Sequence, residues 1–310
     1  MVTALISHAA CLEHDPGPYH PECPDRLRAV LTALDAPEFA PLLREEAPRA
    51  TQEQLVRVHP ARIVDAILAI HPDDGDTVHI DADTAMSAGS AEAALRAAGA
   101  GIFGVDLVMR GAVANAFAAV RPPGHHAEPS RPMGFCLFNN AGIAAQHARA
   151  AHGLRRVAVV DFDVHHGNGT QALFAQNPDL FYGSSHQFPF YPGTGDVWEC
   201  GIANNIVNVP LRERDSSAAF RAAWEGTIIP ALDRFAPEFL IISAGFDAHR
   251  DDPLAQIRLE NSDFAWITEA LLEIARSHAG GRVVSMMEGG YDLEALAACA
   301  AIHVRGLMNA

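Results

Sequence analysis

The stretch Asp161-Phe162-Asp163-Val164-His165-His166 (DFDVHH) directly follows the apolar run Val-Ala-Val-Val at residues 157–160. A short run of this kind predicts a strand that is buried on both faces of a sheet. In α/β proteins, ligands bind beyond the carboxyl ends of such strands. Two carboxylates and two imidazoles at this position therefore predict both the sheet and a metal or acid–base site at its edge.

Short apolar runs alternate with longer helical segments along the rest of the chain. The predicted strands span residues 4–7, 113–120, 157–160, 180–184, 206–209, 239–243 and 283–287. The predicted helices span residues 24–35, 87–109, 140–151, 216–235, 262–277 and 293–308. This alternation predicts an α/β fold, with a mostly parallel central sheet and helices on both faces. Since no linker divides residues 1–310, we expect a single domain, with segments 45–54 and 71–83 as candidate insertions.

The charge and cysteine content exclude several classes of protein. The chain has 38 acidic against 22 basic side chains, a formal net charge of -16 that repels nucleic-acid phosphates. Its five cysteines form no C-x-x-C pair, which indicates reduced thiols. The N-terminus lacks a basic, apolar signal pattern, and no apolar run approaches the about 20 residues of a membrane span. We therefore expect a cytoplasmic protein that binds neither nucleic acid nor membrane.

Polar residues also follow the other predicted strands. These segments are RPPGHH (121–126), GSSH (183–186), SAGFD (243–247) and EGGY (288–291). Because the carboxyl ends of parallel strands meet at one edge of a sheet, we expect the segments to form one composite site.

Three of these residues have the pattern of metal ligands. Asp163 and His165 are two positions apart, so in extended backbone their side chains point to the same side. Asp247 occupies the equivalent place after another strand and is the natural third ligand. Three N/O ligands suit Zn²⁺ or Fe²⁺ and leave a position open for water and substrate. The adjacent His125 and His126 would be strained as joint ligands and are better placed for acid–base work.

Other residues at the strand ends suit supporting roles. Asp161 and Asn168 are candidates for orienting the imidazole rings. Tyr291, after a Gly-Gly turn, is a candidate donor to an oxyanion, whereas His166 is expected to pack structurally. Each motif alone has a structural explanation, and it is their joint occurrence at strand ends that favours a catalytic site.

Seven segments together resemble the zinc-dependent histone deacetylase superfamily, which includes bacterial histone-deacetylase-like amidohydrolases, acetoin-utilisation proteins and acetylpolyamine amidohydrolases. The segments are HPECPDR (20–26), RPPGHHA (121–127), GFCLFNN (134–140), DFDVHHGNGTQ (161–171), PGTGD (192–196), AGFD (244–247) and EGGYD (288–292). They occur in the family's order over nearly the whole chain. The resemblance implies an arginase/deacetylase-like fold and removal of acetyl or other acyl groups from the Nε amine of lysine in proteins or peptides.

The resemblance also implies a role for each site residue. The ligands that it implies for one Zn²⁺ are Asp163, His165 and Asp247. His126 would be the general base and acid, and His125, hydrogen-bonded to Asp161, would be its electrostatic partner. Asn168 would face His126, which is the class II pattern, and Tyr291 would polarise the amide carbonyl.

Substrate and cation contacts follow from the same resemblance. Phe135 and Tyr191 would form the walls of an acyl-lysine tunnel, Leu254 its rim and Gly289 part of its lining, while Asp83 would grip the substrate backbone. The residues implied for K⁺ are Asp161, Asp163 and His165 through backbone carbonyls, with Ser184 and Ser185. A second K⁺ would lie near the carbonyls of Phe174, Asn177 and Leu180.

Three alternative functions stay open. An acetylpolyamine amidohydrolase would keep the chemistry, but its class II relatives carry Glu after Asp-Pro, where this chain has Leu254. An arginase-like ureohydrolase with two metals is suggested by GFDAHRDDP, in which His249 follows Asp247 by two residues. The third alternative is an inactive binding protein on the same fold.

Overall fold

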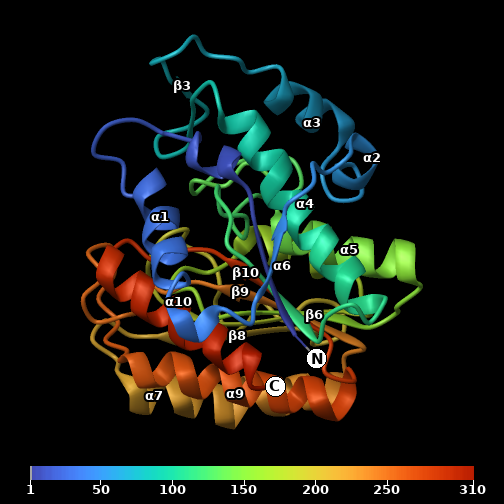
Figure 1. Ribbon diagram of the computed structural model, residues 1–310. Coiled ribbons are helices and arrows are strands. Elements are labelled where there is room, and N and C mark those ends of the chain that lie inside the picture. Colours follow the sequence, from blue (N-terminus) through green and yellow to red (C-terminus); the bar gives the residue numbers. More distant parts are fainter. Residues whose placement is uncertain (1) are drawn as a thin grey trace.

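The computed structural model describes residues 2–310, which form an eight-stranded sheet with the order β2-β1-β5-β10-β9-β6-β7-β8 (Figure 1). The strands are β1 (Thr3–Ser7), β2 (Leu43–Glu46), β5 (Asn115–Ala118), β6 (Val157–Asp161), β7 (Leu180–Gln187), β8 (Ile206–Leu211), β9 (Phe239–Ala244) and β10 (Val283–Met287). All neighbouring strands of this sheet pair in parallel. A separate antiparallel pair joins β3 (Val78–His79) to β4 (Ala85–Met86).

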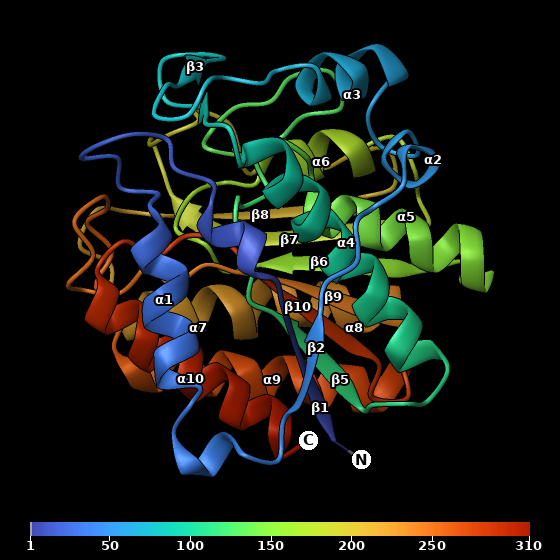
Figure 2. The same ribbon diagram turned by 45° about the horizontal axis from the view of Figure 1, so that its top comes forward.

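Helices cover both faces of the sheet, as predicted. The helices are α1 (Pro24–Ala33), α2 (Gln52–Leu55), α3 (Ala61–Leu68), α4 (Ser90–Met109), α5 (Asn140–His152), α6 (Asn168–Phe174), α7 (Ser217–Ala223), α8 (Ile229–Phe235), α9 (Asn261–His278) and α10 (Leu293–Met308). Figure 2 shows α4 and α5 on one side of the sheet and α7, α9 and α10 on the other. A π-helical turn, Trp224–Ile228, joins α7 to α8, so the predicted helix 216–235 is one nearly continuous element.

Two local expectations were wrong. Strand β7 continues past its predicted end at residue 184, so Ser185 and His186 lie within it, because β8 pairs with it as far as Gln187. The segment 45–54 is not an insertion: Glu45 and Glu46 pair with β1 at the sheet edge, and α2 follows. Strand β2 has no apolar run that would have predicted it, since an edge strand need not be apolar.

The site is positioned by the centre of the sheet, where β5, β10, β9 and β6 are neighbours. Strands β5, β6, β9 and β10 are buried along their whole length, as their Val, Ile, Leu and Phe content predicts. The loops that follow these strands leave the sheet at the same edge and carry the predicted site residues.

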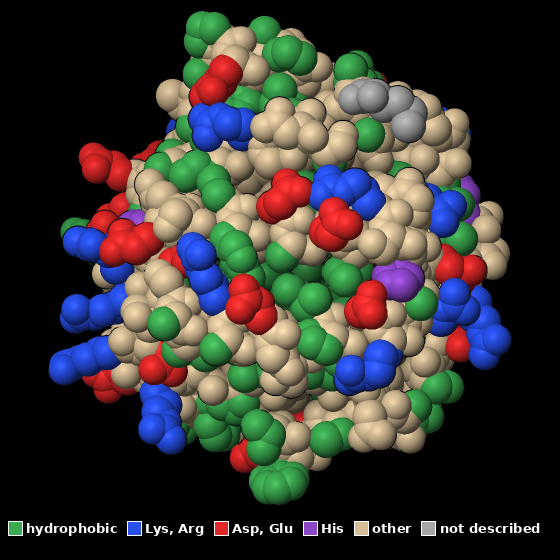
Figure 3. All heavy atoms as spheres, turned by 90° about the horizontal axis from the view of Figure 1, so that it is seen from below, with side chains coloured by type: hydrophobic (Ala, Val, Ile, Leu, Met, Phe, Trp, Pro, Cys, Tyr) green, Lys and Arg blue, Asp and Glu red, His purple; other side chains and the backbone are tan. Residues whose placement is uncertain are grey.

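The surface carries a mixture of charges. On the face shown in Figure 3, acidic and basic side chains are interspersed, which is typical of a solvated surface. All 22 basic side chains of the chain are arginine, so it contains no lysine. Among residues 2–310, no helix combines the length and the apolar character needed to cross a bilayer.

Candidate active site

The three predicted metal ligands converge. One donor atom of each of Asp163, His165 and Asp247 lies within 4.8 Å of the others, and all three residues are buried. His165 Nδ1 lies 3.1 Å from Asp163 Oδ1 and 3.0 Å from Asp247 Oδ2. The sequence predicted that Asp163 and His165 point to the same side because their backbone is extended. This reason was wrong, because the backbone after β6 bends. Asp163 Oδ1 accepts the His165 N–H at 2.9 Å, which holds the bend.

The donor set fits a divalent cation. Burial, together with Asp163, raises the pKa of Asp247 to about 7. At Asp163 burial acts in the same direction, but His125 and His165 outweigh it and lower the pKa of this carboxyl group. Two carboxylates that share a water-poor site repel each other unless a positive charge lies between them. Two Asp and one His are also donors that Zn²⁺ accepts, so the residues suit the metal that the family implies.

The two adjacent histidines, His125 and His126, have different partners. His125 Nδ1 lies 3.0 Å from Asp161 Oδ2, and His126 Nδ1 lies 2.8 Å from Asn168 Oδ1. Burial opposes protonation of His125, but Asp163 and Asp161 outweigh it and raise its pKa well above the ordinary value. Burial and the neighbouring His125 instead hold the pKa of His126 well below its ordinary value. His126 is thus the neutral imidazole of the pair.

Glu128, which the sequence did not indicate, fixes the tautomer of His126 through Asn168. Asn168 Nδ2 donates to Glu128 Oε1 at 2.9 Å and lies 3.3 Å from Met133 Sδ. The amide oxygen of Asn168 must therefore face His126, and an amide oxygen only accepts. His126 carries its proton on Nδ1, which leaves the Nε2 lone pair free.

Two further residues were quoted within motifs but received no role. Glu288 Oε2 accepts the N–H groups of Gly124 at 2.7 Å and His125 at 3.2 Å, so it holds the loop that carries both histidines. Burial raises the pKa of Glu288 to about 7. Arg26 Nε donates to the Gly290 carbonyl at 2.6 Å, and its guanidinium lies 4.7 Å from the centre of the Tyr291 ring. Arg26 thereby supports the loop of Tyr291.

A cavity of about 190 Å³ opens onto these groups. Its lining residues are Asp83, His126, Gly134, Phe135, His165, Tyr191, Leu254 and Tyr291. The rings of Phe135 and Tyr291 pack edge to face with centroids 5.9 Å apart, and those of Tyr191 and His126 with centroids 5.1 Å apart. The structure therefore brings the predicted wall, rim and catalytic residues together around one cavity.

Gly289 has a different position from the one expected. It is not among the residues that line the cavity, and its N–H donates to Asp163 Oδ2 at 2.8 Å. A Cβ at this position would overlap the carboxylates of Asp247 and Asp163. Glycine is therefore needed here to leave room for two of the predicted metal ligands.

The residues implied for K⁺ are partly engaged by other groups. Ser184 pairs with Asp161 across β6 and β7, and its Oγ lies 2.9 Å from His186 Nδ1. Ser185 Oγ accepts from Trp224 Nε1 at 2.9 Å. At the position implied for a second K⁺, three carbonyls converge, and all three accept from the side-chain nitrogen of Asn205. These carbonyls belong to Phe174, Asn177 and Leu180, at 3.0, 3.0 and 2.7 Å.

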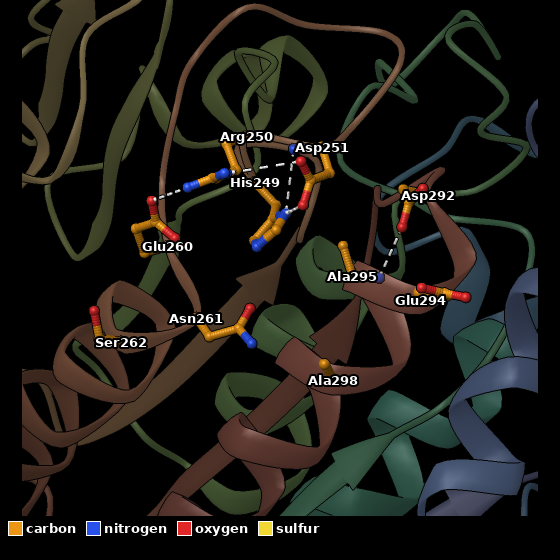
Figure 4. Close-up of a pocket in the computed structure, with 10 residues that line it drawn as sticks. All are labelled: His249, Arg250, Asp251, Glu260, Asn261, Ser262, Asp292, Glu294, Ala295 and Ala298. Carbon is orange, nitrogen blue, oxygen red and sulfur yellow. Dashed lines mark hydrogen bonds and ion pairs between the residues drawn. The ribbon is translucent and has the colours of Figure 1, made fainter.

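His249 lies apart from the predicted metal ligands. Its Nδ1 accepts the N–H of Asp251 at 3.3 Å, and it lines a separate cavity of about 610 Å³ (Figure 4). Residues from the starts of α9 and α10, including Glu260 and Asp292, form the opposite walls. Within residues 2–310, His249 does not join the group of Asp163, His165 and Asp247. The two-metal arginase-like alternative therefore loses the residue that suggested it.

Known proteins are similar to this chain over nearly its whole length. The family model of the histone deacetylase domain matches residues 20–307. A histone deacetylase-like amidohydrolase of Pseudomonas aeruginosa is 37% identical, over 94% of this chain and 82% of its own. A mouse protein named polyamine deacetylase HDAC10 is 35% identical, over 100% of this chain and 48% of its own.

A solved structure shares the architecture as well. The HDA15 HD domain superposes with a TM-score of 0.92 at 37% identity, over 99% of this chain and 88% of that one. This likeness confirms the predicted deacetylase-like α/β fold with its parallel sheet. The chain therefore belongs to the histone deacetylase family of hydrolases.

Proposed function

We propose that the chain, as a single catalytic domain of residues 1–310, is a zinc-dependent amidohydrolase that removes acetyl or other acyl groups from lysine Nε in proteins or peptides. The observation that carries the proposal is the 190 Å³ cavity, at which aromatic walls, His126, His165 and Tyr291 meet. Phe135 and Tyr191 suit the aliphatic stem of lysine, which packs on apolar surface. Asp83 at the same cavity offers a carboxylate to backbone N–H groups of a peptide.

Asp163, His165 and Asp247 would hold one Zn²⁺ in this site. When bound, Zn²⁺ acts as a Lewis acid toward the acyl carbonyl and lowers the pKa of a water molecule. The three side chains would hold the cation next to the cavity, which His165 lines. Near them, Asp161, Asp163, His165, Ser184 and Ser185 would hold K⁺, with Ser185 contributing its backbone because its hydroxyl already accepts from Trp224.

The catalytic steps belong to three side chains. His126, neutral and with Nε2 unprotonated, takes the proton of the attacking water and later returns it to the leaving amine. His125, held by Asp161, keeps positive charge beside it. Burial raises the pKa of Tyr291 well above its ordinary value, so its hydroxyl keeps the proton that it donates to the oxyanion of the tetrahedral intermediate.

Acetylated polyamines are the second candidate substrate, supported by the similarity to the mouse polyamine deacetylase. The apolar Leu254 at the cavity favours acyl-lysine, because it offers no charge to a second amine of a polyamine. The test compares kcat/KM of the zinc-loaded protein on an acetyl-lysine peptide and on acetylputrescine, with a panel of longer acyl-lysines. We expect the peptide to be preferred. Faster turnover of acetylputrescine would assign the polyamine function, and inactivity on the whole panel would leave the binding-protein alternative.

A further inference from the structure

A second cluster of metal-ligating side chains lies between α4 and α5. His147 Nε2 and His152 Nε2, both on α5, each lie 2.7 Å from the same oxygen, Oδ1 of Asp106 on α4. One donor atom of each residue lies within 4.8 Å of the others. The two helices pack side by side on one face of the sheet (Figure 2). The cluster thus bridges two helices that are distant in sequence.

This cluster is separate from the active site. Helix α5 begins at Asn140, whose side chain donates to the Pro122 carbonyl in the loop of the catalytic histidines. His152 is the last residue of the same helix, about 18 Å further along its axis. The other side of the cluster, Asp106, is likewise in the last turn of α4.

We propose that Asp106, His147 and His152 form a second divalent-metal site, of the kind that binds Zn²⁺. Two imidazoles and one carboxylate are ligands that Zn²⁺ accepts, and three protein ligands leave a fourth position for water. His147 is buried, whereas His152 and Asp106 are partly exposed, so an ion can reach the site from solvent. The carboxyl end of α5 also favours a cation, because the helix dipole is negative there.

Small side-chain movements suffice for binding. In a tetrahedral site with ligand atoms about 2.1 Å from the ion, two ligand atoms are about 3.4 Å apart. The Nε2 atoms of His147 and His152 now lie 2.7 Å from Asp106 Oδ1, so each distance must increase by about 0.7 Å. His152 ends its helix and is 24% exposed on its side chain, so it has room to move. Hydrogen bonds from His147 and His152 outweigh the effect of burial and lower the pKa of Asp106, which keeps the carboxylate available.

Arg57 competes with the metal. Its guanidinium nitrogen lies 3.1 Å from His147 Nδ1, and a guanidinium only donates. His147 therefore carries its proton on Nε2, the atom that a metal needs. Binding moves this proton to Nδ1 and turns Arg57 away toward Glu53, its other partner at 3.1 Å. Arg57→Gln supplies a carbonyl that can accept from Nδ1, so we expect it to tighten binding about tenfold.

The test titrates metal-free full-length protein with Zn²⁺ by calorimetry. We expect two sites per chain in the wild type and in Arg57→Gln, and one in His152→Gln and in the double variant His147→Gln/His152→Gln. His278→Gln is the matched control, since His278 contacts a lone carboxylate, Asp233, at 2.7 Å and should keep both sites.

The same number of Zn²⁺ sites and the same affinities in wild type and His152→Gln would overturn the proposal. Deacetylase activity is measured on the same proteins and should not change in these variants. Inactive wild-type protein that still loses one Zn²⁺ site on His152→Gln would refute the proposed function and leave this inference standing.

Discussion

The carboxylate of Asp252 accepts the backbone N–H of Tyr291 at 2.7 Å. Its other oxygen accepts the N–H of Leu254 at 2.9 Å, and the residue is only 7% exposed. One buried side chain thus ties the cavity rim to Tyr291, the proposed donor to the oxyanion. Asp252 is a positioning residue, because it acts through the backbone of the groups that line the cavity.

Replacing Asp252 by Ala should lower kcat about 10- to 100-fold with a smaller change in KM, because Tyr291 loses its fixed position. Asp252→Asn keeps one acceptor oxygen and should lose less. Steady-state kinetics with zinc analysis measures both effects. Asp251→Ala, an exposed neighbour, is the control, and equal kinetics of the two Ala variants would refute the role of Asp252.

Tyr291→Phe should reduce the rate about 10²- to 10³-fold while zinc stays bound, because one oxyanion donor is lost and the ring remains. Activity and metal content are measured on the same preparation. Activity within a few fold of wild type would remove Tyr291 from the mechanism.

Glu128→Ala should lower kcat about tenfold, because Asn168 loses the partner that orients its amide toward His126. If Glu128 acts through Asn168, the substitution should have little further effect in an Asn168→Ala background. The double-mutant cycle, with ¹⁵N NMR of the His126 ring to follow its tautomer, tests this. Additive losses and an unchanged tautomer would indicate a purely structural effect of Glu128.

Gly289→Ala should lower zinc affinity, since the added Cβ meets the carboxylates of Asp247 and Asp163. Gly226→Ala is the matched control, because a Cβ there meets no atom within 4 Å. Zinc affinity is measured by competition with a chelator. Equal affinities in the two variants would contradict the proposed need for space at Gly289.

Stability should fall as the pH is lowered from 6.5 to 4, in part because of His59. Burial lowers the pKa of His59 to about 4, so the unfolded chain takes up a proton in this range and the folded chain does not. This difference corresponds to about 3 kcal/mol of unfolding free energy. Urea unfolding across this pH range should give a shallower dependence for His59→Gln than for wild type. Parallel curves would mean that His59 binds no more protons in the unfolded chain than in the folded chain over this pH range, which would refute its contribution.

The fold was predictable wherever apolar runs coincide with buried strands, as at β6 and β9. Strand β2 was not, because its Leu-Arg-Glu-Glu sequence lies at the sheet edge and pairs only with β1. Helix α6 was overlooked because it begins at Asn168, inside a segment that was interpreted only as a functional motif. Apolar periodicity finds elements with a buried apolar face, whereas β2 is largely exposed and the buried residues of α6 are mostly polar or glycine.

The site was predictable to the extent that its residues follow strands. Asp163, His165 and Asp247 were identified by that rule, although the local backbone was expected to be extended. The sequence predicted no role for Glu288 or Asp252, since their roles depend on contacts with Gly124 and Tyr291 that only the folded chain creates. Spacing within a motif carries no information about such distant partners.

The absence of lysine from residues 1–310 has a consequence for the chemical modification of such an enzyme. Acyl donors that modify lysine amines find no side-chain amine in residues 1–310, because these residues include arginine but no lysine. The conditions that create acyl-lysine in other proteins therefore leave the charges of this one unchanged. An enzyme of this composition cannot become its own side-chain substrate, and its activity cannot be tuned by lysine acylation of itself.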